Sequence, residues 1–81
     1  MDLTNKINLS KVRLEHAKDS LLDAQEALKS ERYKNAANRS YYAIFHAMRA
    51  VLALDGIDRK KHSGVISDFR KLYIKTNIFS I

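Results

Sequence analysis

The chain has 81 residues, a net charge of +6 from 15 basic and 9 acidic side chains, and no cysteine. Its length allows one domain that buries only about 60 to 65% of the surface its unfolded form exposes, so we expect a partner subunit to contribute to its stability. The missing cysteines exclude disulfides, thiol catalysis and thiolate metal sites. No apolar run of signal-peptide or membrane-spanning length occurs, so the sequence predicts a cytoplasmic protein without a membrane segment.

The first predicted helix covers residues 10–30, with Ser10 as its N-cap. Apolar residues recur there at steps of three, four and five, and charged residues occupy the opposite side. The central members of this stripe are Val12, Ala17, Leu21, Ala24 and Leu28, and the members that widen it are Leu14, Leu22 and Ala27. This pattern is typical of an amphipathic helix that buries one face.

The second predicted helix covers residues 32–55. Its broad apolar side contains Tyr41, Ile44, Phe45, Met48, Val51, Leu52 and Ala53. Gly56 follows directly and fits the C′ position, where a left-handed backbone conformation is needed. A helix end is therefore predicted at residue 55.

The third predicted helix follows a basic loop, residues 57–61, and extends from Ser63 as N-cap to about Lys75. Its apolar face contains Val65, Ile66, Phe69, Leu72 and Tyr73. No segment shows sustained period-two alternation, so we predict no sheet. The fold class is therefore all-α, an antiparallel bundle of three main helices. The apolar tail residues Ile78, Phe79 and Ile81 are expected to be covered by the core, a second copy or a continuation of the chain.

Positive charge accumulates toward the C-terminus. Basic and acidic residues number five and five over residues 1–30, four and two over 31–55, and six and two over 56–81. A basic surplus of this kind favours a polyanion such as RNA, or an acidic protein partner, although an ordinary solvated helix face also fits it. His62, beside Lys60 and Lys61 at a helix start, fits either a phosphate ligand or a plain loop residue.

A polar stripe follows one side of the second helix. It consists of Asn35, Arg39, Tyr42, His46 and Arg49, at positions i, i+4, i+7, i+11 and i+14. Seven residues complete almost two turns, so Arg39 and His46 leave the same face. A histidine that accepts the proton of a ribose 2′-hydroxyl and an arginine that neutralises charge on the phosphate suit RNA cleavage without a metal. Tyr42 is placed to hydrogen-bond the phosphate or stack on a base.

Spacing alone leaves structural interpretations open. His46 near aromatic residues fits a buried structural histidine, and Arg39 fits an ion pair with a carboxylate, for which the candidates are Glu31, Glu26 and Asp23. Tyr41 and Phe45 fit core positions, and His16 is expected to be solvent exposed. The sequence has no glycine-rich phosphate loop and no zinc-ligand spacing, so we predict no metal and no organic cofactor.

Two segments carry a resemblance to a known family: Asn38-Arg39-Ser40-Tyr41-Tyr42-Ala43-Ile44-Phe45-His46-Ala47 and Lys60-Lys61-His62-Ser63-Gly64-Val65-Ile66. Over roughly residues 10–78 the chain resembles the small prokaryotic branch of the HEPN superfamily (higher eukaryotes and prokaryotes nucleotide-binding). The resemblance implies an all-α helical bundle, a homodimer, and an Arg-x4–6-His motif that makes active members metal-independent endoribonucleases. Arg39 and His46 fill this motif with six residues between them.

The resemblance also implies a role. Family members are often toxins encoded beside a minimal nucleotidyltransferase antitoxin, and one branch is silenced at a tyrosine two residues after the motif histidine, where this chain has Met48. Members continue through one or two more helices, so residues 1–81 are expected to form a single domain without the family's C-terminal helices.

We therefore expect an endoribonuclease, the toxin of a toxin–antitoxin pair, that acts as a dimer with two Arg39–His46 pairs facing each other across the two-fold axis. The expected ligands of the substrate phosphates are Asn35, Tyr42, Arg49, Lys60, Lys61 and His62. Two alternatives belong to other classes: a non-catalytic module that binds a nucleotide or RNA or docks the nucleotidyltransferase, and a purely structural dimeric bundle.

Overall fold

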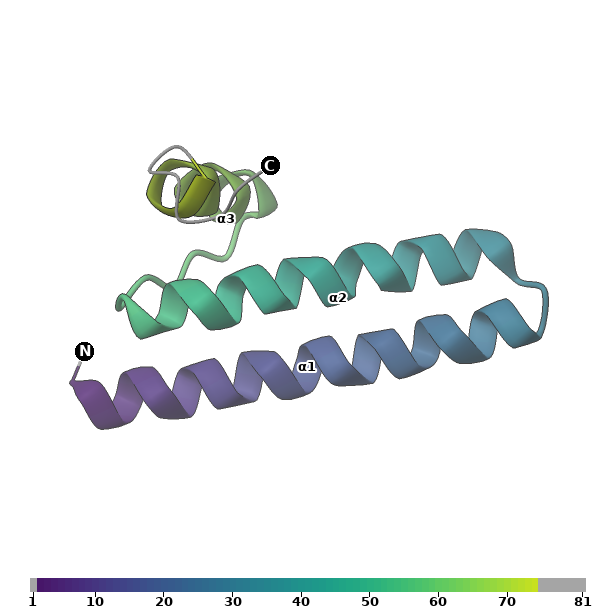
Figure 1. Cartoon of the computed structure of the whole chain (residues 1–81), viewed down its shortest axis with the longest axis horizontal. Helices are drawn as coiled ribbons and strands as arrows, with labels where there is room; N and C mark the ends of the chain where they lie inside the picture. The colour runs from purple at the N-terminus through teal and green to yellow at the C-terminus, as the bar shows by residue number, and fades with distance from the viewer. Residues whose placement is uncertain (1, 75–81) are drawn as a thin grey trace.

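Two long antiparallel helices form the body of the molecule. The computed structural model describes residues 2–74, in which α1 (Leu3–Lys29) and α2 (Tyr33–Leu54) lie side by side (Figure 1). The shorter α3 (His62–Phe69) continues into a π-helical turn, η1 (Arg70–Ile74), and packs on α2 rather than α1. Figure 1 shows α3 crossing over the end of α2 that is farther from the α1–α2 turn. The described part contains no strand, so the all-α prediction is confirmed.

The start of α1 lies seven residues before the predicted one. The carboxylate of Asp2 accepts a hydrogen bond from the backbone N–H of Asn5 at 2.8 Å, which caps the helix at Leu3. Ser10, predicted as the cap, lies inside the helix and donates its hydroxyl to the carbonyl of Ala50 at 2.8 Å. The prediction was wrong because residues 3–9 have little apolar periodicity, whereas the cap at Asp2 lets the helix begin before them.

The second helix was predicted to within one residue at each end. Its C-terminal signal acts as expected, because Gly56 has φ +77°, in the left-handed region that favours glycine. Its N–H donates to the carbonyl of Ala53 at 3.0 Å, and the N–H of Ile57 donates to Leu52 at 3.1 Å. These two bonds satisfy carbonyls at the end of the helix.

Small side chains fill the contact between α1 and α2. Its buried residues are Ala17, Ser20, Ala24 and Ala27 on α1, and Ala36, Ala50 and Ala53 on α2. Small residues let two helix backbones approach closely. The larger members of the stripe predicted on α1 are 45–59% exposed, a correction that concerns Val12, Leu14, Leu21, Leu22 and Leu28. They flank the alanines, and among the described elements α1 packs on α2 alone, which leaves these side chains exposed.

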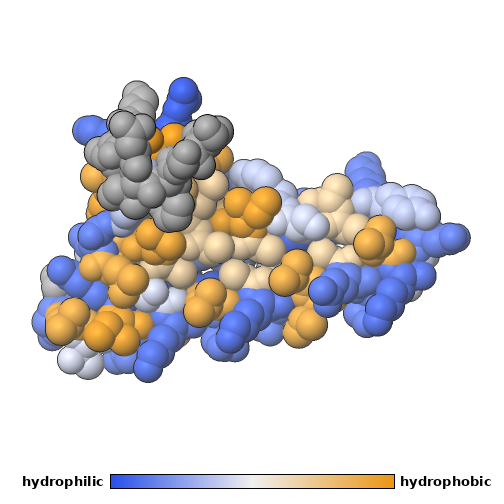
Figure 2. Space-filling view, in the orientation of Figure 1, coloured by the Kyte–Doolittle hydropathy of each residue, from blue (hydrophilic) through white to orange (hydrophobic). Residues whose placement is uncertain are grey.

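The exposed apolar residues are extensive. Figure 2 shows hydrophobic side chains along both long helices on the face in view. On α1, Leu14, Leu21 and Leu28 are spaced by seven and therefore share one side of the helix. On α2, Tyr41 is 43% and Ile44 58% exposed, so the apolar side predicted for this helix is buried only in part.

A second core lies where α3 crosses α2. Phe45 and Leu52 of α2 contact Val65 of α3, and each is at most 5% exposed. Partly buried apolar side chains surround them: Tyr42, Met48, Ile57, Phe69, Leu72 and Tyr73. No helix in the described residues is long and apolar enough to cross a membrane.

The third helix differs from its prediction in two details. It begins at His62, with Lys61 in the capping position and no side-chain cap, so Ser63 is not the N-cap. Its α-helical part ends at Phe69, before η1, and Ile66 is 43% exposed instead of buried. Lys75 and the apolar tail residues Ile78, Phe79 and Ile81 lie outside the described residues.

Replacement of Leu52 by alanine is expected to lower the free energy of unfolding by about 2–5 kcal/mol, because Leu52 is 1% exposed and its removal leaves a cavity in the second core. Urea unfolding followed by circular dichroism measures this change. The control Leu22→Ala removes the same atoms from a side chain that is 59% exposed, and should change the free energy by less than about 0.5 kcal/mol. Equal effects of the two variants would contradict the described core.

Candidate functional site

The polar stripe lies on α2, and its two ends have different surroundings. Arg39 and His46 are two helical turns apart, about 10 Å along the axis. Asn35 and Arg39 lie toward the α1–α2 turn, whereas Tyr42, His46 and Arg49 lie toward α3. The stripe therefore offers two neighbouring polar regions along one helix.

The first region is an open hollow between α1 and α2. Its charged and polar lining residues are Asp23, Glu26, Arg32, Asn35, Asn38 and Arg39. Arg39 is exposed and forms no hydrogen bond or ion pair with any other residue in the range 2–74, so the expected alternative of a carboxylate partner is not realised there. Its guanidinium is free to bind an anion.

The second region surrounds the imidazole of His46, which is half-buried. The ring stacks on Tyr42 with centroids 6.3 Å apart and meets the ring of His16, from α1, edge-on at 5.3 Å. Its Nδ1 is buried and has no hydrogen-bond partner among the described residues. Its other ring nitrogen, Nε2, also has no hydrogen-bond partner among the described residues and is not counted with the buried unpartnered atoms. This nitrogen is available to a substrate.

The electrostatics of this region favour a neutral imidazole. Burial lowers the pKa of His46 below its usual 6.5. Coulombic interactions with His16, Arg49, Arg13 and His62 lower the pKa of His46 further, in that order of size. The lowered pKa favours the neutral form of His46, the form that a general base requires.

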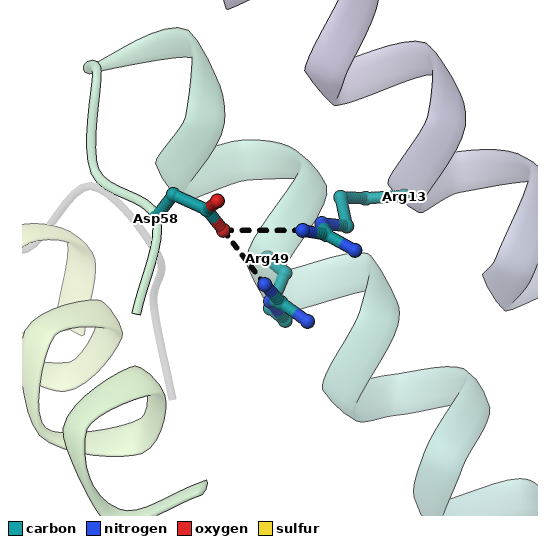
Figure 3. A network of polar contacts seen from close by, with 3 residues as sticks. All are labelled: Arg13, Arg49 and Asp58. Carbon is teal, nitrogen blue, oxygen red and sulfur yellow. Dashed lines mark hydrogen bonds and ion pairs between the residues drawn. The ribbon is translucent and has the colours of Figure 1, made fainter. Parts of the chain in front are cut away.

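Two arginines from different helices meet beside His46. Figure 3 shows Arg13 of α1 and Arg49 of α2 directed at the same carboxylate oxygen of Asp58, in the loop before α3. The donor–acceptor distances are 3.3 Å from Arg13 and 2.7 Å from Arg49. The hydrogen bond from Arg49 is the main cause that lowers the pKa of Asp58. The guanidinium of Arg49 also lies 5.8 Å from the centroid of the Phe45 ring.

Arg13 and Asp58 were not predicted as part of the site. They are 45 residues apart, and no sequence spacing connects them. Arg49 was predicted as a phosphate ligand, and the structure places it in this three-residue cluster. The position of Arg49 on the polar stripe was the one feature of the sequence that pointed to this cluster.

His62 joins the second region from α3. Its Nδ1 lies 3.1 Å from the hydroxyl of Tyr41, and its ring packs at 4.1 Å on Phe45, a residue of the core. The exposed lysines before it, Lys60 and Lys61, instead line a separate hollow beside α3. His16 is exposed as expected, although its ring touches His46.

The structure thus gathers four of the predicted site residues around one point: Tyr42, His46, Arg49 and His62. Asn35 and Arg39 lie in the neighbouring hollow, and Lys60 and Lys61 lie apart from both regions. Among residues 2–74 no group of three or more His, Asp or Glu side chains is gathered closely enough to hold a metal ion.

The lowered pKa of His46 leads to a prediction about stability. The unfolded chain takes up a proton near pH 6.5 while folded His46 resists it, so the free energy of unfolding should fall as pH drops below about 6.5, until folded His46 also titrates. Urea unfolding at pH 7.5 and 5.5 measures this loss, which should be smaller in His46→Gln and unchanged in Asn38→Gln. An identical pH dependence in all three proteins would contradict the described environment of His46.

Comparison with known proteins gives consistent matches. The family model described as HEPN domain matches residues 10–80. A Methanocaldococcus jannaschii protein named "Putative toxin MJ0142" is 42% identical over 77 residues, which cover 95% of this chain and 52% of the relative. A Thermotoga maritima "UPF0332 protein" is 43% identical over 60 residues, covering 74% of this chain and 46% of the relative. The chain thus spans about half the length of these curated relatives. No solved structure matches it.

Proposed function

The chain belongs to the HEPN domain family, and from this premise we propose that it is a toxin module that cleaves RNA without a metal, with Arg39 and His46 as the catalytic residues. The observation that carries the proposal is the imidazole of His46, whose pKa is lowered by burial and whose Nε2 has no hydrogen-bond partner among the described residues. The relative named as a putative toxin, similar over 95% of this chain, supports the toxin role.

The chemistry assigns one task to each group. His46 Nε2 accepts the proton of a ribose 2′-hydroxyl, the 2′-oxygen attacks the adjacent phosphorus, and the bond from phosphorus to the 5′-oxygen breaks as that oxygen takes up a proton from water. Arg39 stabilises the negative charge that grows on the phosphate oxygens. The remaining predicted ligands hold the RNA phosphates on either side of the cleaved one: Asn35, Tyr42, Arg49, Lys60, Lys61 and His62. The products carry a 2′,3′-cyclic phosphate and a 5′-hydroxyl.

We also propose a cytoplasmic homodimer in which the two Arg39–His46 pairs face each other across the two-fold axis. Within one chain the two residues lie two turns apart on α2. A second copy would bring another arginine and histidine to the same RNA phosphate. A minimal nucleotidyltransferase is the proposed antitoxin, in keeping with the relatives named as putative toxins.

The test is incubation of the purified protein with an unstructured RNA in EDTA, followed by analysis of the product ends. We expect cleavage that leaves cyclic phosphates and 5′-hydroxyls. No cleavage, or 3′-hydroxyl ends formed only after Mg²⁺ is added, would overturn the proposal. Tight RNA binding without cleavage would assign the site to a non-catalytic binding module.

A further inference from the structure

We propose that Arg13 and Arg49 form a phosphodiester-binding site for single-stranded RNA beside His46, and that Asp58 fixes the spacing of the two guanidinium groups. The role of His46 in this inference rests on the proposed function. The site adds α1, through Arg13, to a surface that the sequence assigned to α2 and to residues 60–62.

The hydrogen bonds of the cluster leave donors unused. One carboxylate oxygen of Asp58 accepts a hydrogen bond from a terminal nitrogen of Arg13 and another from a terminal nitrogen of Arg49. The Nε of each arginine is buried without a partner, and the other terminal nitrogen of each has no hydrogen-bond partner among the described residues. Figure 3 shows these nitrogens directed away from Asp58 and toward the same side. An oxyanion placed there would accept from both guanidinium groups.

The charges of the cluster favour an anion. Two arginines face one carboxylate, so one positive charge remains uncompensated, and their side chains are only 18% and 12% exposed. Partial burial reduces the screening of this charge by solvent. The negative charge of Asp58 reduces the repulsion between the two guanidinium groups, so they can lie close together before a ligand binds.

The position of the cluster suggests how an RNA strand would lie. On the stripe of α2, His46 stands between Arg49, three residues later, and Arg39, seven residues earlier. A strand laid along α2 would place one phosphate at Arg13 and Arg49, and the phosphate that is cleaved between His46 and Arg39. His46 would then face the ribose whose 2′-hydroxyl attacks that phosphate.

The test measures binding separately from cleavage. A fluorescent single-stranded RNA with 2′-O-methyl groups has no free 2′-hydroxyl and cannot be cut by the proposed reaction. We expect Arg13→Gln to weaken its binding on the order of 10-fold and to reduce the salt dependence of log Kd by about one unit, the effect of one lost phosphate contact. Arg13→Lys, which keeps the charge but loses the planar fork, should weaken binding less.

The matched control is Lys11→Gln, the same charge change at an exposed position of α1, which should alter Kd less than about two-fold. All proteins are compared at a temperature where circular dichroism shows each to be folded. If Arg13→Gln binds the RNA as tightly as Lys11→Gln, even with a lowered Tm, the inference is overturned. Arg13 would then only stabilise the contact between α1 and the loop. Wild-type protein that binds no RNA would overturn it too.

The outcomes separate this inference from the proposed function. Binding that depends on Arg13 in a protein that cuts no unmodified RNA would support the phosphate site and refute the ribonuclease. Cleavage that depends on His46, together with RNA binding that Arg13→Gln does not change, would support the ribonuclease and refute the phosphate site.

Discussion

Replacement of His46 by alanine is expected to slow RNA cleavage by about 10²- to 10⁴-fold, the usual contribution of a general base. The pKa of His46 is lowered, which favours the neutral form that accepts a proton in the proposed reaction, and its Nε2 has no hydrogen-bond partner among the described residues. Single-turnover rates on one RNA oligonucleotide, measured in EDTA, give the ratio directly. The wild-type rate should fall on the acid side with a midpoint below pH 6.5, because folded His46 titrates there.

His62→Ala is the matched control for this experiment. His62 is also a histidine near Tyr42, but it is exposed on α3 and packs on Phe45. As an expected phosphate ligand, it should affect the rate by about 10-fold at most, the size of one lost charge-assisted hydrogen bond. If His46→Ala cleaves at the wild-type rate, or if the two variants lose equal activity, His46 is not the base.

Replacement of Arg39 by alanine is expected to slow cleavage by about 10²- to 10³-fold, the cost of removing one group that stabilises charge in the transition state. Arg39 has no ion-pair partner within residues 2–74, so its loss should leave the fold intact and act on kcat more than on KM. Single-turnover rates over a range of protein concentrations separate the two effects. Arg39→Lys should recover part of the rate, because the charge returns without the planar fork.

Arg32→Ala tests whether position matters or only charge. Arg32 lines the same hollow as Arg39 but lies just before α2 begins. Its replacement should change the rate by less than about three-fold, as expected of an exposed charge away from the chemistry. Similar losses of cleavage rate in both variants would show that the hollow attracts RNA through its overall positive charge. Arg39 would then have no specific role in stabilising the transition state.

The sequence was most informative where one helix carries all the necessary residues. The polar stripe was predictable because its members share α2, and helical periodicity alone puts them on one side. The end of α2 was predictable because Gly56 occupies a left-handed position that few other residues tolerate. In both cases local geometry decides the result.

Predictions from local sequence patterns failed where a contact between residues far apart in the sequence determines the structure. Leu21 and Leu28 continue the apolar stripe of α1 but remain exposed, because alanines between them make the contact with α2. The pairing of Arg13 with Asp58 joins residues 45 positions apart and depends on where the loop before α3 places Asp58. Such a contact has no spacing rule, so the second arginine beside His46 was visible only in the structure.

The most direct measurement for the central claim compares two substrates cut by the same wild-type protein in EDTA. One is an RNA oligonucleotide, and the other is its copy with 2′-deoxyribose at the cleaved position. We predict that the RNA is cut there and the copy is not, because the 2′-hydroxyl is the attacking group. Equal cleavage of both substrates, or cleavage of neither until Mg²⁺ is restored, would contradict metal-independent cleavage by Arg39 and His46.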